Sequence, residues 1–167
     1  MKALFIGRFQ PFHLGHLLLI QQLINQYDEL IIGIGSSQYQ GTYDNPFSEK
    51  ERRQMITQSL STMGFHTYRI VSIPDIHDPP HWVDHVCSIV SDFDVIIANN
   101  PFTRKLFSKK GFKVKGTAFF DRKRYSGKEI RRRIIQDEQW SMLVPGSVFK
   151  IIIAIDGITR LKSVPHS

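Results

Sequence analysis

The chain has 167 residues, a net charge of +7 and one cysteine, Cys87. This length suits a single domain, residues 1–167, which buries roughly two-thirds of the surface of the unfolded chain. A lone cysteine argues against a disulfide-stapled secreted scaffold, and no apolar run approaches the ~20 residues of a membrane span, so we expect a cytoplasmic protein without a membrane partner.

Short apolar runs alternate with helical patterns along the chain, which predicts βαβ units and a parallel sheet. The expected strands are residues 3–6, 30–34, 68–73, 95–98 and 113–117. The expected helices are residues 15–26, 49–62, 81–91, 102–109, 127–136 and 146–156. The sequence therefore predicts an α/β fold, a Rossmann-like doubly wound parallel sheet of about five strands flanked by helices.

Local signals refine these boundaries. Ser48 with Glu51, and Ser126 with Glu129, have the spacing of a helix capping box. Residues 149–155 fit either a strand or a helix, and we take them as a helix because Val148, Ile151, Ile152 and Ile155 share one helical face. The two longest irregular segments, 36–47 and 74–80, follow strand ends, where ligands of open α/β sheets bind. We expect both to line a site.

Residues 7–16, with the sequence Gly-Arg-Phe-Gln-Pro-Phe-His-Leu-Gly-His, join the first strand to the first helix. The free N–H groups and the dipole of a helix N-terminus attract anions. His13 and His16 reach this terminus, and Gly15 lets a ligand approach the backbone closely. A helix cap or a zinc pair are the alternatives, but zinc needs three or four ligands. The segment therefore favours phosphate binding, to which Arg8 adds a rigid guanidinium fork unless it is a surface arginine.

A second candidate site surrounds residues 126–131. Ser126 is expected to cap a helix, which leaves N–H groups at its mouth, and Arg131 lies one turn further. The surrounding segment, residues 104–133, contains thirteen Lys and Arg residues but only two acids. This excess favours either a local field for anions or a solvated basic surface.

A third group lies in residues 75–85. His77, His81 and His85 have the spacing of a metal ladder on a helix, but Pro79 and Pro80 argue against a continuous helix. We therefore expect no metal site there. Trp82 suits either the core or stacking on a flat cationic ring.

The segment 7–16 resembles the H-x-G-H signature of the nucleotidyltransferase α/β-phosphodiesterase superfamily. Within it, the chain is most similar to the archaeal type of nicotinamide-mononucleotide adenylyltransferase, and the likeness extends to residues 155–162. The resemblance implies that His13 and His16 contact the phosphates of ATP and stabilise charge in the transition state. It also implies that this loop binds ATP through Gly7, Arg8, Phe9 and Gly15.

Residues 126–131 resemble the second signature of this family, S-x-T-x-x-R, which closes over the phosphates of ATP. The resemblance implies that Ser126 binds ATP and that Arg131 is catalytic. Lys128 stands where the family has Thr, so one hydroxyl contact is missing, although the lysine could itself meet phosphate.

The resemblance also implies where the acceptor binds. Trp82 is expected to stack on the nicotinamide ring, and groups near Asp75 are expected to read its amide. Asn100 follows a strand end and corresponds to an asparagine that the family places beside the bound nucleotides; the alternative is an ordinary turn.

The activity implied is transfer of AMP from ATP to nicotinamide mononucleotide, giving NAD and pyrophosphate, by direct in-line attack. Mg²⁺ is expected to be held largely by ATP, because no carboxylate cluster stands ready. The archaeal members of the family imply a homo-oligomer, with a hexamer as the expected size.

Two alternatives remain open. The same chemistry could use nicotinate mononucleotide or pantetheine phosphate as acceptor, or transfer a cytidylyl group. A basic nucleic-acid-binding module could use residues 104–133, with Phe107, Phe112 and Phe119 stacking on bases, although these aromatics fit a core equally well.

Overall fold

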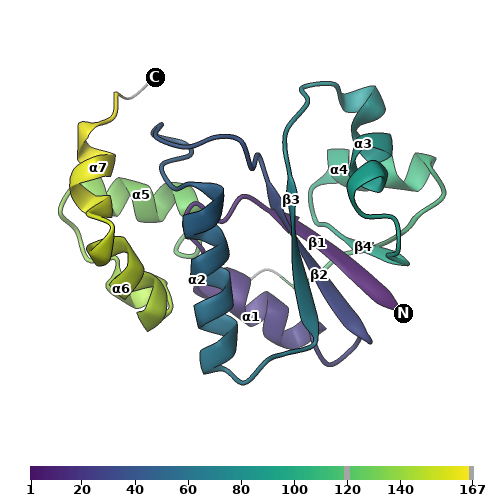
Figure 1. The fold of residues 1–167 in the computed structure, drawn as a ribbon, viewed down its shortest axis with the longest axis horizontal. Helices are drawn as coiled ribbons and strands as arrows, with labels where there is room; N and C mark the ends of the chain where they lie inside the picture. Colours follow the sequence, from purple (N-terminus) through teal and green to yellow (C-terminus); the bar gives the residue numbers. More distant parts are fainter. Residues whose placement is uncertain (119–120, 166–167) are drawn as a thin grey trace.

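Five parallel strands form the centre of the computed structural model, which describes residues 1–118 and 121–165 (Figure 1). They pair in the order β3-β2-β1-β4-β5. Their bounds are Lys2–Gly7 for β1, Glu29–Gly35 for β2, Tyr68–Ile73 for β3, Val95–Ile97 for β4 and Lys113–Lys115 for β5. The chain winds outward from β1 in both directions, so the predicted doubly wound fold is confirmed.

Seven α-helices connect and follow these strands in the described residues. They are α1 (Leu14–Leu23), α2 (Glu49–Thr62), α3 (Trp82–Ile89), α4 (Pro101–Lys109), α5 (Gly127–Ile135), α6 (Gly146–Ala154) and α7 (Gly157–Ser163). Short 3-10 turns span Pro79–His81 and Ser141–Leu143. The helical interpretation of residues 149–155 is confirmed as far as Ala154, where α6 ends, whereas α7 was not predicted. The left-handed backbone of Asp156 (φ 56°) separates the two helices and lets the chain turn into a second one.

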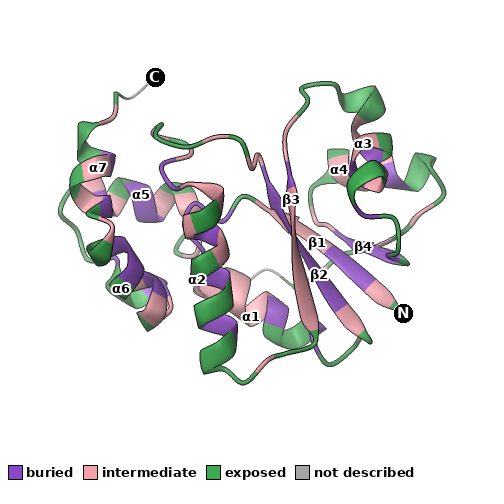
Figure 2. Ribbon diagram, viewed as in Figure 1, coloured by how far each residue is buried: buried purple, intermediate pink, exposed green. Residues whose placement is uncertain are grey.

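The sheet separates two hydrophobic clusters, as the alternation along β1 requires. Ala3 and Phe5 face the cluster that α1, α2, α5, α6 and α7 cover. Leu4 and Ile6 face the cluster that α3 and α4 cover. Figure 1 shows these helices on opposite sides of the sheet, and Figure 2 shows buried residues in the central strands and on the helix surfaces that pack against them.

One of the two predicted capping boxes forms completely. Ser48 Oγ accepts the N–H of Glu51, whose carboxylate accepts the N–H of Ser48, both at 3.1 Å. Ser126 likewise accepts the N–H of Glu129 at 3.1 Å. The carboxylate of Glu129, however, bonds to Arg132 and Arg133. The second box is therefore only half formed, because two nearby guanidinium groups attract the carboxylate more strongly than a backbone N–H does.

Two side-chain amides extend the sheet pairing beyond the carboxyl ends of the strands. Gln38 donates to the carbonyl of Asp75 (2.8 Å) and accepts its N–H (2.9 Å), which joins the segments after β2 and β3. Asn99 accepts the N–H of Thr117 (2.8 Å) and donates to its hydroxyl (3.0 Å), which joins the segments after β4 and β5. These bonds fix the segments that surround the cavities described below. Every helix in the described residues is too short or too polar to cross a bilayer.

Candidate active site

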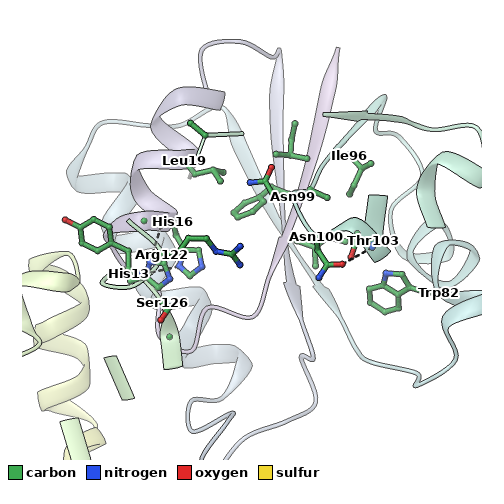
Figure 3. A pocket seen from close by; sticks show the side chains of 18 residues that line it. His13, His16, Leu19, Trp82, Ile96, Asn99, Asn100, Thr103, Arg122 and Ser126 are labelled. Atoms are coloured by element: carbon green, nitrogen blue, oxygen red, sulfur yellow. Dashed lines mark hydrogen bonds between the residues drawn. The ribbon is translucent and has the colours of Figure 1, made fainter. Parts of the chain in front are cut away.

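Two adjoining cavities open at the carboxyl ends of the strands, where the strand order reverses between β1 and β4. Their volumes are about 420 and 410 Å³, and both are lined by Ile6, Trp82 and Thr103. The first also contains the H-x-G-H loop and the start of α5 (Figure 3). The second contains Gly7, Arg8 and the segments after β2 and β3. Two ligands that react with each other could therefore bind side by side.

The two histidines of the first cavity hold each other in place. His13 is the N-cap of α1, and its Nδ1 accepts the N–H of His16 at 3.3 Å. His16 Nδ1 in turn accepts the N–H of His13 at 3.2 Å. Because a backbone N–H can only donate, both Nδ1 atoms are unprotonated, and each neutral ring carries its proton on Nε2. Both residues line the first cavity.

Burial keeps these rings neutral. It lowers the pKa of His13 to about 3, and it lowers the pKa of His16 well below its ordinary value, with a further contribution from the nearby His13. The two rings stack with centroids 3.6 Å apart, and the ring of Phe9 meets His16 edge-on at 4.7 Å. At neutral pH the pair is therefore suited to donate hydrogen bonds rather than to act as fixed cations.

The glycines and Phe9 of this loop serve the protein's own packing. A Cβ at Gly15 would lie 2.9 Å from Cβ of Tyr125 and 3.0 Å from the ring of His13. A Cβ at Gly7 would lie 2.9 Å from the ring of Phe9, which is buried beneath the histidines. The space at Gly15, which the sequence suggested for ligand approach, is thus occupied by Tyr125 and His13.

Arg131 is buried between α5 and the first loop. Its Nη1 donates to the carbonyl of Gln10 at 2.8 Å, and its Nη2 lies 3.6 Å from the carboxylate of Asp44. The ring of Tyr43 faces the guanidinium at 5.6 Å. Within the described residues, Nε of Arg131 has no hydrogen-bond partner although it is buried. Burial lowers the pKa of Arg131, and repulsion from Arg8 lowers it further. An anion bound nearby would offset both effects.

The second cavity brings together Arg8, Asp75 and Trp82. Trp82 is half-buried at the start of α3, packs partly against the core and lines the cavity with the rest of its surface, so stacking on a ring stays a prediction. The backbone N–H and carbonyl of Asp75 bond to Gln38, and its carboxylate accepts the N–H of His77. Arg8 is exposed.

Of the remaining predicted site residues, two line the first cavity and one lines neither cavity. Ser126 lines the first cavity as the cap of α5, and Asn100 lines it as the cap of α4. The side-chain oxygen of Asn100 accepts the N–H groups of Phe102 and Thr103, at 2.9 and 3.1 Å. Lys128 is exposed and lines neither cavity.

The three spaced histidines bond to separate groups. His77 contacts the hydroxyl of Tyr39, His81 bonds to Asp78 at 2.8 Å, and His85 bonds to the carbonyl of Pro74 at 2.8 Å. In the described part of the chain, no three His, Cys, Asp or Glu residues are grouped as metal ligands.

The aromatics of the basic segment belong to the core where the structure describes them. Phe107 is fully buried, and Phe112 stacks on Phe93 with centroids 4.9 Å apart. Phe119 lies outside the described residues. Stacking on bases would need exposed rings, which Phe107 and Phe112 do not provide.

Sequence reasoning missed two arginines. Arg122 lines the first cavity, and Figure 3 shows its side chain beside His16. Arg52 is completely buried in α2. Its position on the same helix face as Met55 and Ile56 is the signal that could have identified it, because a charged residue in an apolar stripe needs a buried partner.

The chain is similar to a well-defined group of proteins. The family described as cytidylyltransferase-like matches residues 4–133. The nicotinamide-nucleotide adenylyltransferase of Archaeoglobus fulgidus is 44% identical, with 98% of this chain and 97% of that protein covered. The enzyme of the same name from Picrophilus torridus is 39% identical, with 100% and 99% covered.

A solved structure shares the fold. It is a bifunctional NMN adenylyltransferase/ADP ribose pyrophosphatase from Francisella tularensis, complexed with AMP and a manganese ion. The TM-score is 0.80 at 23% identity, with 97% of this chain covered. The match covers 52% of that protein, so this chain spans about half its length.

Proposed function

Since this chain belongs to the cytidylyltransferase-like family, and to the group of its archaeal nicotinamide-nucleotide adenylyltransferase relatives, we propose that it transfers AMP from ATP to nicotinamide mononucleotide. The products are NAD and pyrophosphate. A 5′-phosphate oxygen of the mononucleotide attacks the α-phosphorus of ATP, the new P–O bond forms, and the bond to pyrophosphate breaks.

The two adjoining cavities carry this proposal. A direct transfer needs both nucleotides at once, with the attacking oxygen in line with the leaving group. The first cavity, with His13, His16 and Ser126, suits ATP, and the second, with Asp75 and Trp82, suits the mononucleotide. The two cavities share Ile6, Trp82 and Thr103 in their lining, so ligands bound in them would lie against each other.

The neutral histidines suit this reaction. A phosphate monoester is mostly dianionic at pH 7, because its second pKa is about 6, so no side chain has to remove a proton from the nucleophile. What the transition state needs is stabilisation of charge on the phosphoryl oxygens. The Nε2–H groups of His13 and His16 can supply it as hydrogen-bond donors.

Arg131 lines neither cavity, but its guanidinium lies directly behind Gly127, which lines the first, and from there it can attract phosphate oxygens. Its Nη2 lies 3.6 Å from the exposed carboxylate of Asp44, which is too long for a hydrogen bond, so a phosphate group could take the place of that carboxylate. The donors identified here are nitrogen atoms, whereas Mg²⁺ prefers oxygen ligands. The cation would therefore enter with ATP, as MgATP, rather than in a protein site.

The test is analysis of products after incubation of the protein with MgATP and each acceptor in turn. NAD and pyrophosphate should form with nicotinamide mononucleotide, at a kcat/KM higher than with nicotinate mononucleotide. Pantetheine phosphate as acceptor and CTP as donor should give no product. Dominant product from either of the last two would overturn the proposal.

Light scattering of the same sample tests whether the protein is the homo-oligomer, a hexamer, that we propose.

A further inference from the structure

Arg52 carries a fully buried charge and is not among the residues assigned to the proposed reaction. It lies in the first turns of α2, directly behind the wall of the second cavity. Three of the backbone carbonyls that it contacts belong to residues lining that cavity: Arg8, Gly35 and Ser36. The guanidinium therefore lies beneath the ends of β1 and β2, behind the second cavity.

The hydrogen bonds of Arg52 use its whole guanidinium. Nε donates to the carbonyl of Ser48 at 3.2 Å, and Nη1 donates to those of Arg8 and Gly35, both at 3.0 Å. Nη2 reaches the carbonyls of three residues of the segment after β2 at 3.3 to 3.4 Å; they are Ser36, Ser37 and Tyr39. Only the five N–H groups of an arginine can hold so many carbonyls, since a lysine has three.

The charge of Arg52 has no direct counterion among the described residues. All its hydrogen bonds go to neutral carbonyls, and the two acids of α2 that attract it without contact are paired with other cations: Glu49 with Arg53 and Glu51 with Arg160. Burial lowers the pKa of Arg52 to about 10, so it remains a cation at neutral pH. Burying a charge is costly unless another charge compensates it. A bound phosphate in the adjacent cavity would do so.

We propose that Arg52 is a positioning residue that holds the ends of β1 and β2 in register and places a fixed positive charge beneath the phosphates of the bound nucleotides. Its bond to the carbonyl of Arg8 orients the backbone from which that exposed side chain reaches the cavity. This inference rests on the proposed function for the identity of the nucleotides.

The test compares ligands that differ only in their phosphates. Affinities for ATP and adenosine, and for nicotinamide mononucleotide and nicotinamide riboside, are measured by calorimetry on wild type, Arg52→Met and Arg52→Lys. Arg52→Met should weaken binding of each phosphorylated ligand about tenfold and of each nucleoside less than twofold. Arg52→Lys keeps the charge, so it should restore most of the preference for phosphate. Both variants should melt at lower temperature, because neither satisfies all the carbonyls.

A matched control is the next residue of the helix. Arg53 pairs with Glu49 at 2.8 Å on the half-exposed side of α2, so Arg53→Met should leave both affinity ratios unchanged. Comparing two ligands on one protein cancels any loss of folded material. If phosphorylated and unphosphorylated ligands weaken equally in Arg52→Met, the residue is only a brace and the proposal fails. Selective loss for either phosphorylated ligand supports it. Product analysis of the wild type, by contrast, decides the proposed function alone.

Discussion

His13 and His16 cap each other: each accepts the backbone N–H of the other on Nδ1, and their rings stack 3.6 Å apart. The same arrangement serves the fold and the site. Two reciprocal hydrogen bonds cap the N-terminus of α1, and both Nε2–H groups remain available as donors. A substitution at either position therefore changes helix capping and hydrogen-bond donation together, and a useful variant must separate the two.

Substitution of His16 by Asn or by Gln separates helix capping from hydrogen-bond donation, because the two amide side chains differ in length. Asn can mimic Nδ1 and keep the cap but has no group at the position of Nε2, whereas Gln can place its amide nitrogen near Nε2. His16→Asn should lower kcat about 10²–10³-fold, the usual cost of losing one charge-stabilising donor. His16→Gln should lose less. Steady-state kinetics and a melting curve check this, and near-normal turnover in folded His16→Asn would leave His16 with a capping role only.

The buried histidines should make stability depend on pH. In the unfolded chain each ring binds a proton below pH 6.5, whereas in the folded chain the pKa of His13 is about 3. Their contribution is therefore complete above pH 6.5 and is lost as the pH falls from 6.5 towards 3. The slope is up to about 1.4 kcal/mol per pH unit for His13.

Urea unfolding between pH 7 and 5 measures this slope while most carboxylates remain ionised. His13→Asn, which can still cap α1, should have a flatter profile than wild type. Parallel profiles would mean that His13 binds its proton over the same pH range in the folded and the unfolded protein.

The sequence predicted the parts of this molecule whose signals are local. Periodicity placed the strands within a few residues, and the H-x-G-H segment pointed to the cavity at the switch in strand order. Arg52 escaped prediction because its partners are carbonyls from two strand ends and a loop, which only the fold brings together. The sequence did not show why residue 15 is a glycine, since the side chains that fill the space beside it come from Tyr125 as well as from its own turn.

The end of the chain escaped prediction for a different reason. Asp156-Gly157 looks like a helix stop, and it does end α6, but Gly157 also begins α7. Gly157 is needed there because a Cβ would lie 2.9 Å from a methyl carbon of Ile152 and 3.3 Å from the ring of Phe47. The requirement comes from tertiary packing, which a helix-stop signal does not contain.

Arg131 and Arg133 provide a matched pair on one helix. Arg131→Lys keeps the charge but loses the planar fork that bonds Gln10, so KM for ATP should rise and kcat should fall. Arg133 is bonded to Glu129 at 3.0 Å and to the carbonyl of Gln139 at 3.0 Å, not to the loop that carries the histidines. Arg133→Lys should therefore leave the kinetics nearly unchanged. Equal effects at the two positions would indicate that only the general positive field matters.

Trp82 tests the choice of acceptor, because it lines both cavities and also packs against the core. If its exposed face stacks on the pyridine ring, Trp82→Ala should weaken binding of nicotinamide mononucleotide by about 1–3 kcal/mol, by analogy with base stacking on aromatics. This corresponds to roughly a five- to hundredfold change in affinity, with a much smaller change for ATP.

Trp82→Phe is the control for this loss, because it keeps an aromatic face and most of the packing. It should restore much of the affinity for the mononucleotide. A purely structural tryptophan behaves differently: its loss costs about 3–5 kcal/mol of stability and weakens all ligands together. Titration of each nucleotide beside a melting curve distinguishes the two. If Trp82→Ala binds the mononucleotide with unchanged affinity, Trp82 does not stack on the pyridine ring, because loss of a stacking partner would weaken binding.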